Sequence, residues 1–305
     1  ISGAVSSAAA GSGGMVVTGL QAGGVLGLTG NNTFEGDLTI TNATVSLGLA
    51  AVGTGSWNPA NVPSIILNQG GALTLDNTTS QNTNRLKDSI PIRMTGGTVN
   101  LIVTGANTIT ETIGAVTLNG GLNTFNTTRG SGTTDVLTLG GFAISPNSGA
   151  VAAFLGTATL GTVNNSQILI NGLGDSTFLG GNYLAAAATA GVPDNFAMYS
   201  SVTGIAGITT AVALPGAAQT ADVRITASPA NTVDEVTLNV PMIINSLNIF
   251  GGTSTVAMTD NSKTLTVTSG GILSSGSANV ISQGTVTAGS GPLYVNSVTS
   301  AQTLT

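Results

Sequence analysis

The chain contains no cysteine and no histidine. These absences exclude disulfide bonds, thiol nucleophiles, imidazole bases and nearly every transition-metal site. Charge is also scarce, because six basic and twelve acidic residues make up 6% of the 305 residues, against about 25% in an ordinary soluble protein. With so few cations and a net charge of −6, the chain cannot form a basic patch that neutralises phosphates, so nucleic acid is excluded as a partner.

Long apolar runs and aromatic side chains are rare as well. No stretch approaches the roughly 18 consecutive apolar residues of a membrane-spanning helix, so the sequence predicts no membrane insertion by this chain. The chain is nevertheless 41% hydrophobic, which gives it apolar surface to bury and argues against disorder. It opens at Ile1 with neither an initiator Met nor a signal peptide, so we expect it to be processed or excised from a longer chain.

What the sequence has in abundance is alternation with a period of two. Short runs in which apolar residues alternate with Thr or Asn indicate strands with one buried face. The clearest runs are residues 38–41, 73–75, 98–103, 136–139 and 264–268. Glycine pairs separate such runs as corners. In the C-terminal third, apolar residues recur every nine positions, which is natural for the sides of a coil. These residues are Leu238, Leu247, Val256 and Leu265.

These patterns predict an all-β fold, a right-handed parallel β-solenoid with one or two loop excursions, continuous as a single domain over residues 1–305. Inward side chains would stack into an apolar core, and outward ones into ladders of Thr, Ser and Asn. At roughly 20–25 residues per coil, the chain would form about 12–15 coils. Two stretches break the alternation and predict lateral excursions: residues 182–215, with a run of alanines, and residues 56–64, with the single Trp.

One segment carries a specific resemblance. Residues 24–36 read Gly-Val-Leu-Gly-Leu-Thr-Gly-Asn-Asn-Thr-Phe-Glu-Gly, and the similarity continues to Gly48, with Thr44 standing where the pattern usually has Gly. This segment resembles the autotransporter-associated β-strand repeat of bacterial exported proteins. Softer similarities cover much of the rest of the chain. The resemblance implies a secreted or surface-displayed, passenger-like parallel β-solenoid with a structural or adhesive role.

The acidic residues give no sign of an active site. A polysaccharide-active β-helix enzyme would need convergent carboxylates, but the twelve acids are scattered along the chain. Glu35 and Asp37 would share a face at strand spacing, yet both flank Gly36 in a turn, so a solvated corner is the preferred interpretation. Asp234 and Glu235 are adjacent and would face opposite sides of a strand. We therefore expect no enzyme, and no catalytic, metal-binding or cofactor-binding residue.

Two further clusters have alternative interpretations. The turn Asn171–Asp175 is weakly similar to a calcium-binding nonapeptide, but a glycine-rich turn closed by an aspartate side chain is favoured. The run Arg85-Leu86-Lys87-Asp88 is the densest charge cluster in the chain. It is interpreted either as locally neutralised surface or as one side of an ion pair between subunits.

The predicted function follows from the ends of the solenoid. Both terminal stretches read as strands, and an open coil offers unpaired N–H and C=O groups to another chain. The sequence predicts an assembly interface at Ile1, Val5, Leu304 and Thr305. The chain would act as a structural unit of an extracellular or cell-surface fibre, pairing head to tail with itself as a homopolymer or as a tandem repeat of a longer chain. The alternative is an adhesive passenger that displays its loops to a glycan or a host partner.

Overall fold

The computed structural model describes residues 4–6, 13–19, 23–48, 55–104, 108–130, 134–186, 192–208, 221–226, 233–251, 253–276, 279–298 and 303–304. The chain is all-β, and its stacked parallel strands form a β-solenoid of about nine turns. The described part contains no helix, and therefore none that could cross a membrane. The predicted fold class is confirmed, while the right-handed winding and the continuity over one domain stay predictions. The chain divides into two compact units.

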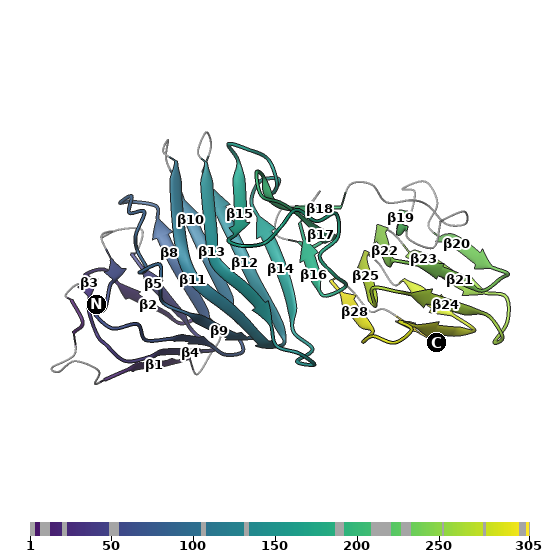
Figure 1. Cartoon of the computed structure of the whole chain (residues 1–305), viewed down its shortest axis with the longest axis horizontal. Helices are drawn as coiled ribbons and strands as arrows, with labels where there is room; N and C mark the ends of the chain where they lie inside the picture. The colour runs from purple at the N-terminus through teal and green to yellow at the C-terminus, as the bar shows by residue number, and fades with distance from the viewer. Residues whose placement is uncertain are drawn as a thin grey trace. The chain divides into compact units, whose positions relative to one another are not determined.

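Unit 1 comprises residues 1–176 and 199–206. Its first sheet stacks seven parallel strands: β1 (Met15–Thr18), β4 (Leu38–Thr41), β7 (Ile65–Leu67), β9 (Ile92–Thr95), β11 (Ile109–Gly120), β13 (Asp135–Ile144) and β15 (Ser166–Ile170). Its second sheet stacks β2 (Val25–Leu28), β5 (Thr44–Leu47), β8 (Ala72–Asn77), β10 (Thr98–Val103), β12 (Leu122–Arg129) and β14 (Val151–Gly156) (Figure 1). The third sheet is short, with β3 (Asn31–Asn32) and β6 (Ser56–Trp57) extended by single bridges from Ser6 to Thr33 and from Trp57 to Leu86.

The strand register fixes the length of each coil. Met15 pairs with Leu38, 23 residues further along the chain, whereas Asp135 pairs with Ser166, 31 residues further along. The first coil thus fits the predicted 20–25 residues, but later coils of unit 1 are longer, because loops such as residues 56–64 add length outside the strands. For this reason the predicted count of 12–15 coils is wrong.

Glycine corners join the first sheet to the second. Gly70 and Gly96 have φ values of 70° and 79°, the left-handed region that glycine enters without strain. Gly71 is required for a different reason, because a Cβ there would lie 2.3 Å from the carbonyl oxygen of Ile40. The paired glycines of the sequence are therefore the positions where each coil turns against the coil below.

Side chains stack in register on both faces of the sheets. On the inner face of the first sheet, Leu38, Ile65 and Ile92 are aligned and fully buried. On the outer face of the second sheet, Asn126 donates to Asn100 (3.4 Å), and Asn100 donates to Thr74 (3.3 Å). The predicted apolar core and polar ladder are both present, and both run from coil to coil.

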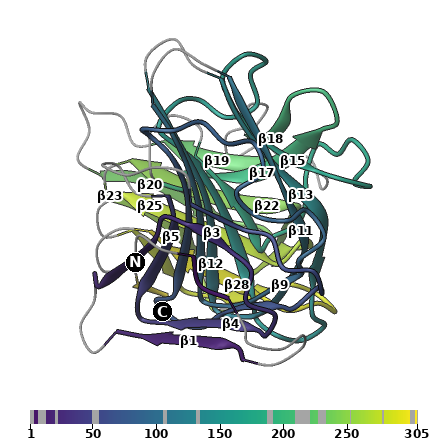
Figure 2. The ribbon, with the colours of Figure 1, turned by 90° about the vertical axis from the view of Figure 1, so that its left-hand side faces the viewer.

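Two long strands of the first sheet, β11 and β13, extend onto the side of the coil that the third sheet occupies in earlier coils. β11 has 12 residues and β13 has ten, whereas the earlier strands of this sheet have three or four. β11 and β13 pair with each other along their length, from Ile109 with Asp135 to Leu118 with Ile144, and the second half of β11 also pairs with β9 (Figure 2). Gly114 lies between the halves of β11, where a Cβ would come within 2.1 Å of the carbonyl oxygen of Ile90. One long strand thus covers two sides of the coil.

Unit 2 comprises residues 177–198 and 207–305. Its strands occupy three parallel sheets, which the chain visits in rotation. The fourth sheet contains β19 (Asp222–Thr226), β22 (Ser246–Gly251), β25 (Gly271–Gly276) and β28 (Tyr294–Ser297). The fifth contains β20 (Val233–Leu238), β23 (Thr253–Met258), β26 (Val280–Ser282) and β29 (Thr303–Leu304), and the sixth contains β21 (Met242–Ile244), β24 (Thr264–Val267) and β27 (Thr285–Thr287).

The apolar residues predicted at nine-residue spacing lie on different sides of the same core. Leu247 is on the fourth sheet, Val256 on the fifth and Leu265 on the sixth, and all three are fully buried. Leu238 on β20 belongs to the same cluster. From Leu247 to Leu265 the spacing therefore measures the length of one side of a three-sided coil, whereas the step from Leu238 to Leu247 passes over β21 of the sixth sheet.

The excursion predicted at residues 182–215 departs from the parallel stacking. β16 (Tyr183–Ala185) pairs antiparallel with β17 (Asn195–Ser200), and β18 (Gly204–Gly207) follows. Asn248 of the fourth sheet donates to the carbonyl oxygen of Asp194 and to Asn195 Oδ1, both at 2.9 Å. This part of the excursion therefore packs against the outer face of the fourth sheet. Residues 187–191 and 209–215 lie outside the described residues.

Candidate functional site

The paired acids Glu35 and Asp37 hold a neighbouring loop. Glu35 Oε1 and Oε2 accept the backbone N–H groups of Ala60 (2.9 Å) and Asn61 (2.8 Å), and these bonds lower the pKa of Glu35. Asp37 Oδ1 accepts the N–H of Ser64 (2.7 Å). The two carboxylates lie at an exposed corner as expected, but they fasten the predicted excursion at residues 56–64 to the preceding coil. The carboxylate oxygens of both residues thus make structural hydrogen bonds to the backbone of this loop.

The side chain of Asp175 also accepts a hydrogen bond from the backbone of another segment. Its Oδ1 accepts the N–H of Ser201 at 2.6 Å, which lowers the pKa of the carboxyl group. The side chains of Asp234 and Glu235 lie outside the described residues. Within the described part of the chain, no three acidic residues gather as a metal ion would require.

The charge cluster at residues 85–88 is organised differently from either interpretation of the sequence. Arg85 is fully buried. Its guanidinium donates to Asn77 Oδ1 (2.9 Å), to the carbonyl oxygen of Gly55 (2.7 Å) and to that of Ser80. Surface neutralisation and an ion pair between subunits are both wrong for Arg85, because its donors point inward to the last residue of β8, to the turn after it and to Gly55.

Lys87 lies at the edge of this cluster. Its Nζ donates to the carbonyl oxygens of Pro59 (2.9 Å) and Ala60 (3.1 Å). Glu35 holds the same loop through the N–H groups of the same stretch. The excursion at residues 56–64 is therefore held by an acid from one coil and a base from the next.

Glu111 is a buried acid next to this arginine. Its side chain is fully buried, Oε1 accepts the N–H of Leu86 at 3.0 Å, and Oε2 has no hydrogen-bond partner. Burial raises the pKa of Glu111 to about 8, while the charge of Arg85 pulls it down and that of Asp88 pushes it up. Leu86 is the last bridge residue that the structure describes in the third sheet. Its N–H is therefore accepted by the carboxyl group of Glu111, where a further strand would offer a backbone carbonyl. The sequence held a signal for this, since alternation places Glu111 on the same face as Ile109 and Ile113.

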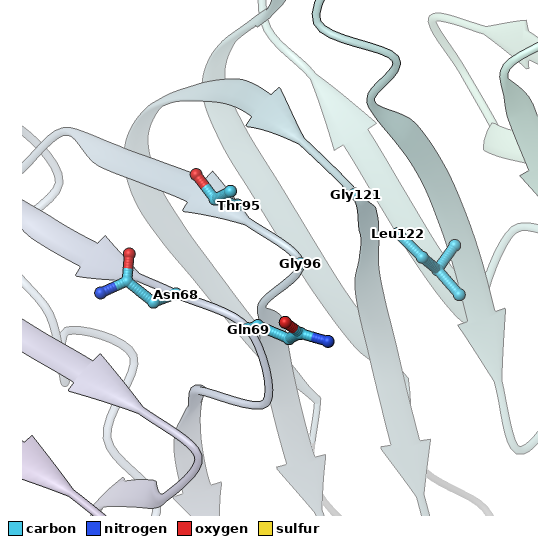
Figure 3. Close-up of a pocket in the computed structure, with 6 residues that line it drawn as sticks. All are labelled: Asn68, Gln69, Thr95, Gly96, Gly121 and Leu122. Atoms are coloured by element: carbon cyan, nitrogen blue, oxygen red, sulfur yellow. The ribbon is translucent and has the colours of Figure 1, made fainter.

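A shallow hollow follows the glycine corners of unit 1. It measures about 570 Å³ and is lined by Asn68, Gln69, Thr95, Gly96, Gly121 and Leu122 (Figure 3). Asn68 Nδ2 donates to Thr41 Oγ1 at 3.0 Å, so that amide is already used in a ladder. The six lining residues contribute two amides, one hydroxyl and the apolar side chain of Leu122, and none of the six is ionisable.

The first coil of unit 1 leaves its outer edge uncovered by any described strand. β1 and β2 are the outermost strands of the first and second sheets. Met15 and Val17 point inward over the fully buried Leu38 and Ile40, yet they are themselves only half-buried. The core column thus ends in apolar side chains that no described residue covers.

The last coil of unit 2 ends in the same manner. β28, β29 and β27 are the outermost strands of the fourth, fifth and sixth sheets. Val295 stacks on the buried Ile272 but is itself 52% exposed. Val286 continues the core through β27 and is only partly buried. This end also presents an apolar core column to solvent.

The predicted interface residues divide between described and undescribed positions. Ile1 and Thr305 lie outside the described residues. Val5 packs beside β3, where its N–H donates to Asn32 Oδ1 (3.0 Å) and its carbonyl accepts from Thr33 (2.8 Å). Leu304 pairs with Ile281 in the fifth sheet. Two neighbouring residues that the sequence did not single out also lie at these ends: Val17 is half-buried and Val295 is 52% exposed.

Comparisons with protein-family models, with curated proteins and with solved structures gave no match to this chain. The stacked parallel coils are compatible with a β-helix repeat protein. Membership of the autotransporter-associated family has no support beyond the resemblance of residues 24–48.

Proposed function

We propose that this chain is a structural unit of an extracellular or cell-surface fibre, in which solenoid ends stack head to tail. The observation that carries the proposal is the pair of uncovered end coils, where edge strands and inward apolar side chains remain open in the described part of the chain. Solenoid proteins ordinarily close such ends with polar caps, because an open edge recruits other strands.

The composition fits this role. The side chains of a stacked fibre repeat close to 4.8 Å apart, so like charges in register repel and uncharged polar ladders are favoured. The ladder of Thr74, Asn100 and Asn126 has this character. Export to the cell surface is the part of the proposal that rests on the resemblance of residues 24–48 alone.

An adhesive role receives less support. The part of the excursion that the structure describes is mostly buried: Leu184, Asn195 and Phe196 are each less than 5% exposed. A loop that is displayed to a glycan would present such side chains to solvent. Glu35 and Asp37, which an enzyme could have used, are taken up by backbone donors.

Electron microscopy of the purified chain tests the proposal. We expect unbranched filaments, and we expect Val295→Lys to abolish them, because a charge would then sit at the open end of the core. Val62→Lys is the matched control: Val62 is also 52% exposed but lies in the loop at residues 56–64. Filaments that survive Val295→Lys, or isolated monomers of the unmodified chain at every concentration, would contradict the proposed function.

A further inference from the structure

The first three and the last three extended segments of the described chain have the same layout. At the start they are the Val5–Ser6 segment, whose bridge lies at Ser6, followed by β1 and β2, which begin at residues 15 and 25; these occupy the third, first and second sheets in turn. At the end they are β27, β28 and β29, which begin at residues 285, 294 and 303 and occupy the sixth, fourth and fifth sheets in turn. The steps are thus nine and ten residues in the first coil and nine in the last.

The inward side chains of the two coils are also complementary. The last coil turns Val286 and Val295 toward its core, and Leu304 lies in register with the buried Ile281. The first coil offers Met15, Val17 and Leu26, which stack on the buried Leu38, Ile40 and Val45. Apolar side chains would therefore meet apolar side chains on every side of the joint.

Neither coil carries a charged residue in these strands. Their sequences are MVVT, VLGL, TVT, YVNS and TL. Natural edge strands are commonly protected from pairing by lysine or by another inward charge. The absence of such protection on both coils leaves each edge free to extend its sheet.

Building on the proposed function, we propose that β27, β28 and β29 of one copy pair in parallel with Val5–Ser6, β1 and β2 of the next copy. In this register Val286 lies over Val5, Val295 over Met15 and Leu304 over Leu26, while Asn296 lies beside Val16 on the outer face. The sixth sheet thereby continues into the third, the fourth into the first, and the fifth into the second.

The matching of three sides at once identifies the occupant as a second copy of this chain. A foreign peptide strand could pair with a single edge and would leave the other two, and the core between them, open. The two coils are different surfaces, so the contact is heterologous and not that of a symmetric dimer. Because the strands pair in parallel, each copy continues the stacking direction of the one before, which favours an open filament over a closed ring.

The chain has no cysteine, so engineered thiols report the register without background. We would prepare Val16→Cys and Asn296→Cys as separate proteins, mix them, let them assemble and oxidise them. In-register parallel neighbours lie about 4.8 Å apart, within the Cα separation that a disulfide tolerates. Val16 is 74% exposed, so the substitution leaves the core unchanged. The control for the face of the strand, here called the parity control, uses Val295→Cys in place of Asn296→Cys. This shift of one residue turns the thiol toward the core, away from residue 16 of the neighbouring copy.

The expected result is a disulfide-linked species of twice 29.7 kDa from the mixture. Neither protein should give it alone, and the parity control should not give it. Amide hydrogen exchange in β1, β2 and β28 should slow on assembly, since these edges gain partners. Filaments without this cross-link and without this protection would overturn the register and leave the proposed function standing. A cross-link from Val16→Cys alone would show a head-to-head contact and overturn it too. Absence of any assembly would overturn both proposals.

Discussion

Replacing Glu111 by Gln should make the protein more stable in alkaline solution. The fully buried carboxyl group has a pKa of about 8, against 4.5 for the ordinary value of the group. The folded protein therefore binds this proton more tightly than the unfolded chain does. The stabilisation is fully present below pH 4.5 and is lost as the pH rises through 8. Glutamine has the shape of the protonated acid, and its carbonyl can still accept the N–H of Leu86.

The magnitude follows from the two pKa values. One pKa unit corresponds to about 1.4 kcal/mol, so the free energy of unfolding of the unmodified protein should fall by on the order of 5 kcal/mol between pH 4.5 and pH 8 on account of this group. Glu111→Gln removes that contribution. The difference in stability between variant and parent should therefore grow in favour of the variant across this interval and become constant above it.

Urea unfolding at a series of pH values measures the effect. Trp57 is the only tryptophan and is fully buried, and its backbone N–H donates to the carbonyl oxygen of Arg85 at 2.7 Å, so its fluorescence reports the same part of the fold. Glu35→Gln is the control, because hydrogen bonds lower the pKa of Glu35 and the sign of the pH dependence is reversed. Parallel pH profiles for Glu111→Gln and the parent would refute the reasoning.

Three further substitutions test other contacts. Arg85→Lys should destabilise the protein by about 3 kcal/mol, since one ammonium cannot reach the three acceptors of the guanidinium, and urea unfolding would detect this. Gly114→Ala should lower the thermal midpoint through a loss of about 3 kcal/mol, whereas Gly174→Ala, with nothing within 4 Å of its new Cβ, should be nearly neutral. Asn123→Ala should cost about 2 kcal/mol, because Asn123 Oδ1 accepts from Gly96 and Nδ2 donates to two carbonyls, and hydrogen exchange at that corner should speed up.

Local patterns predicted the strands well, because a strand with one buried face must alternate. Residues 38–41 and 98–103 form strands with these bounds, and residues 264–267 form a third. The glycine pairs marked corners correctly for a related reason: a coil can turn closely against its neighbour only where the Cβ is missing. The alternation of apolar and polar residues and the glycine pairs at corners each involve only a few consecutive residues. A single sequence is therefore enough to find them.

The polar interior could not be predicted in the same way. The burial of Arg85 combines two acceptors close in sequence, Asn77 and Ser80, with Gly55, which lies 30 residues earlier and reaches Arg85 only when the coils stack. No spacing in the sequence records that convergence. The predicted number of coils was wrong for a similar reason. A loop such as residues 56–64 lengthens one coil without altering the strands on either side, so the strand pattern does not reveal the coil length.

The stacked corners have a consequence for how this chain can change its length. Asn42, Gly70, Gly96 and Gly121 all have positive φ values, between 50° and 79°, where the first sheet hands over to the second. Residues added or removed at this handover would displace a left-handed backbone conformation onto a residue unsuited to it. Additions on the side of residues 56–64 leave these four positions untouched. Homologous chains should therefore differ by insertions on that side, or by whole coils. The number of residues between each of these four left-handed positions and the strands that flank it should stay constant.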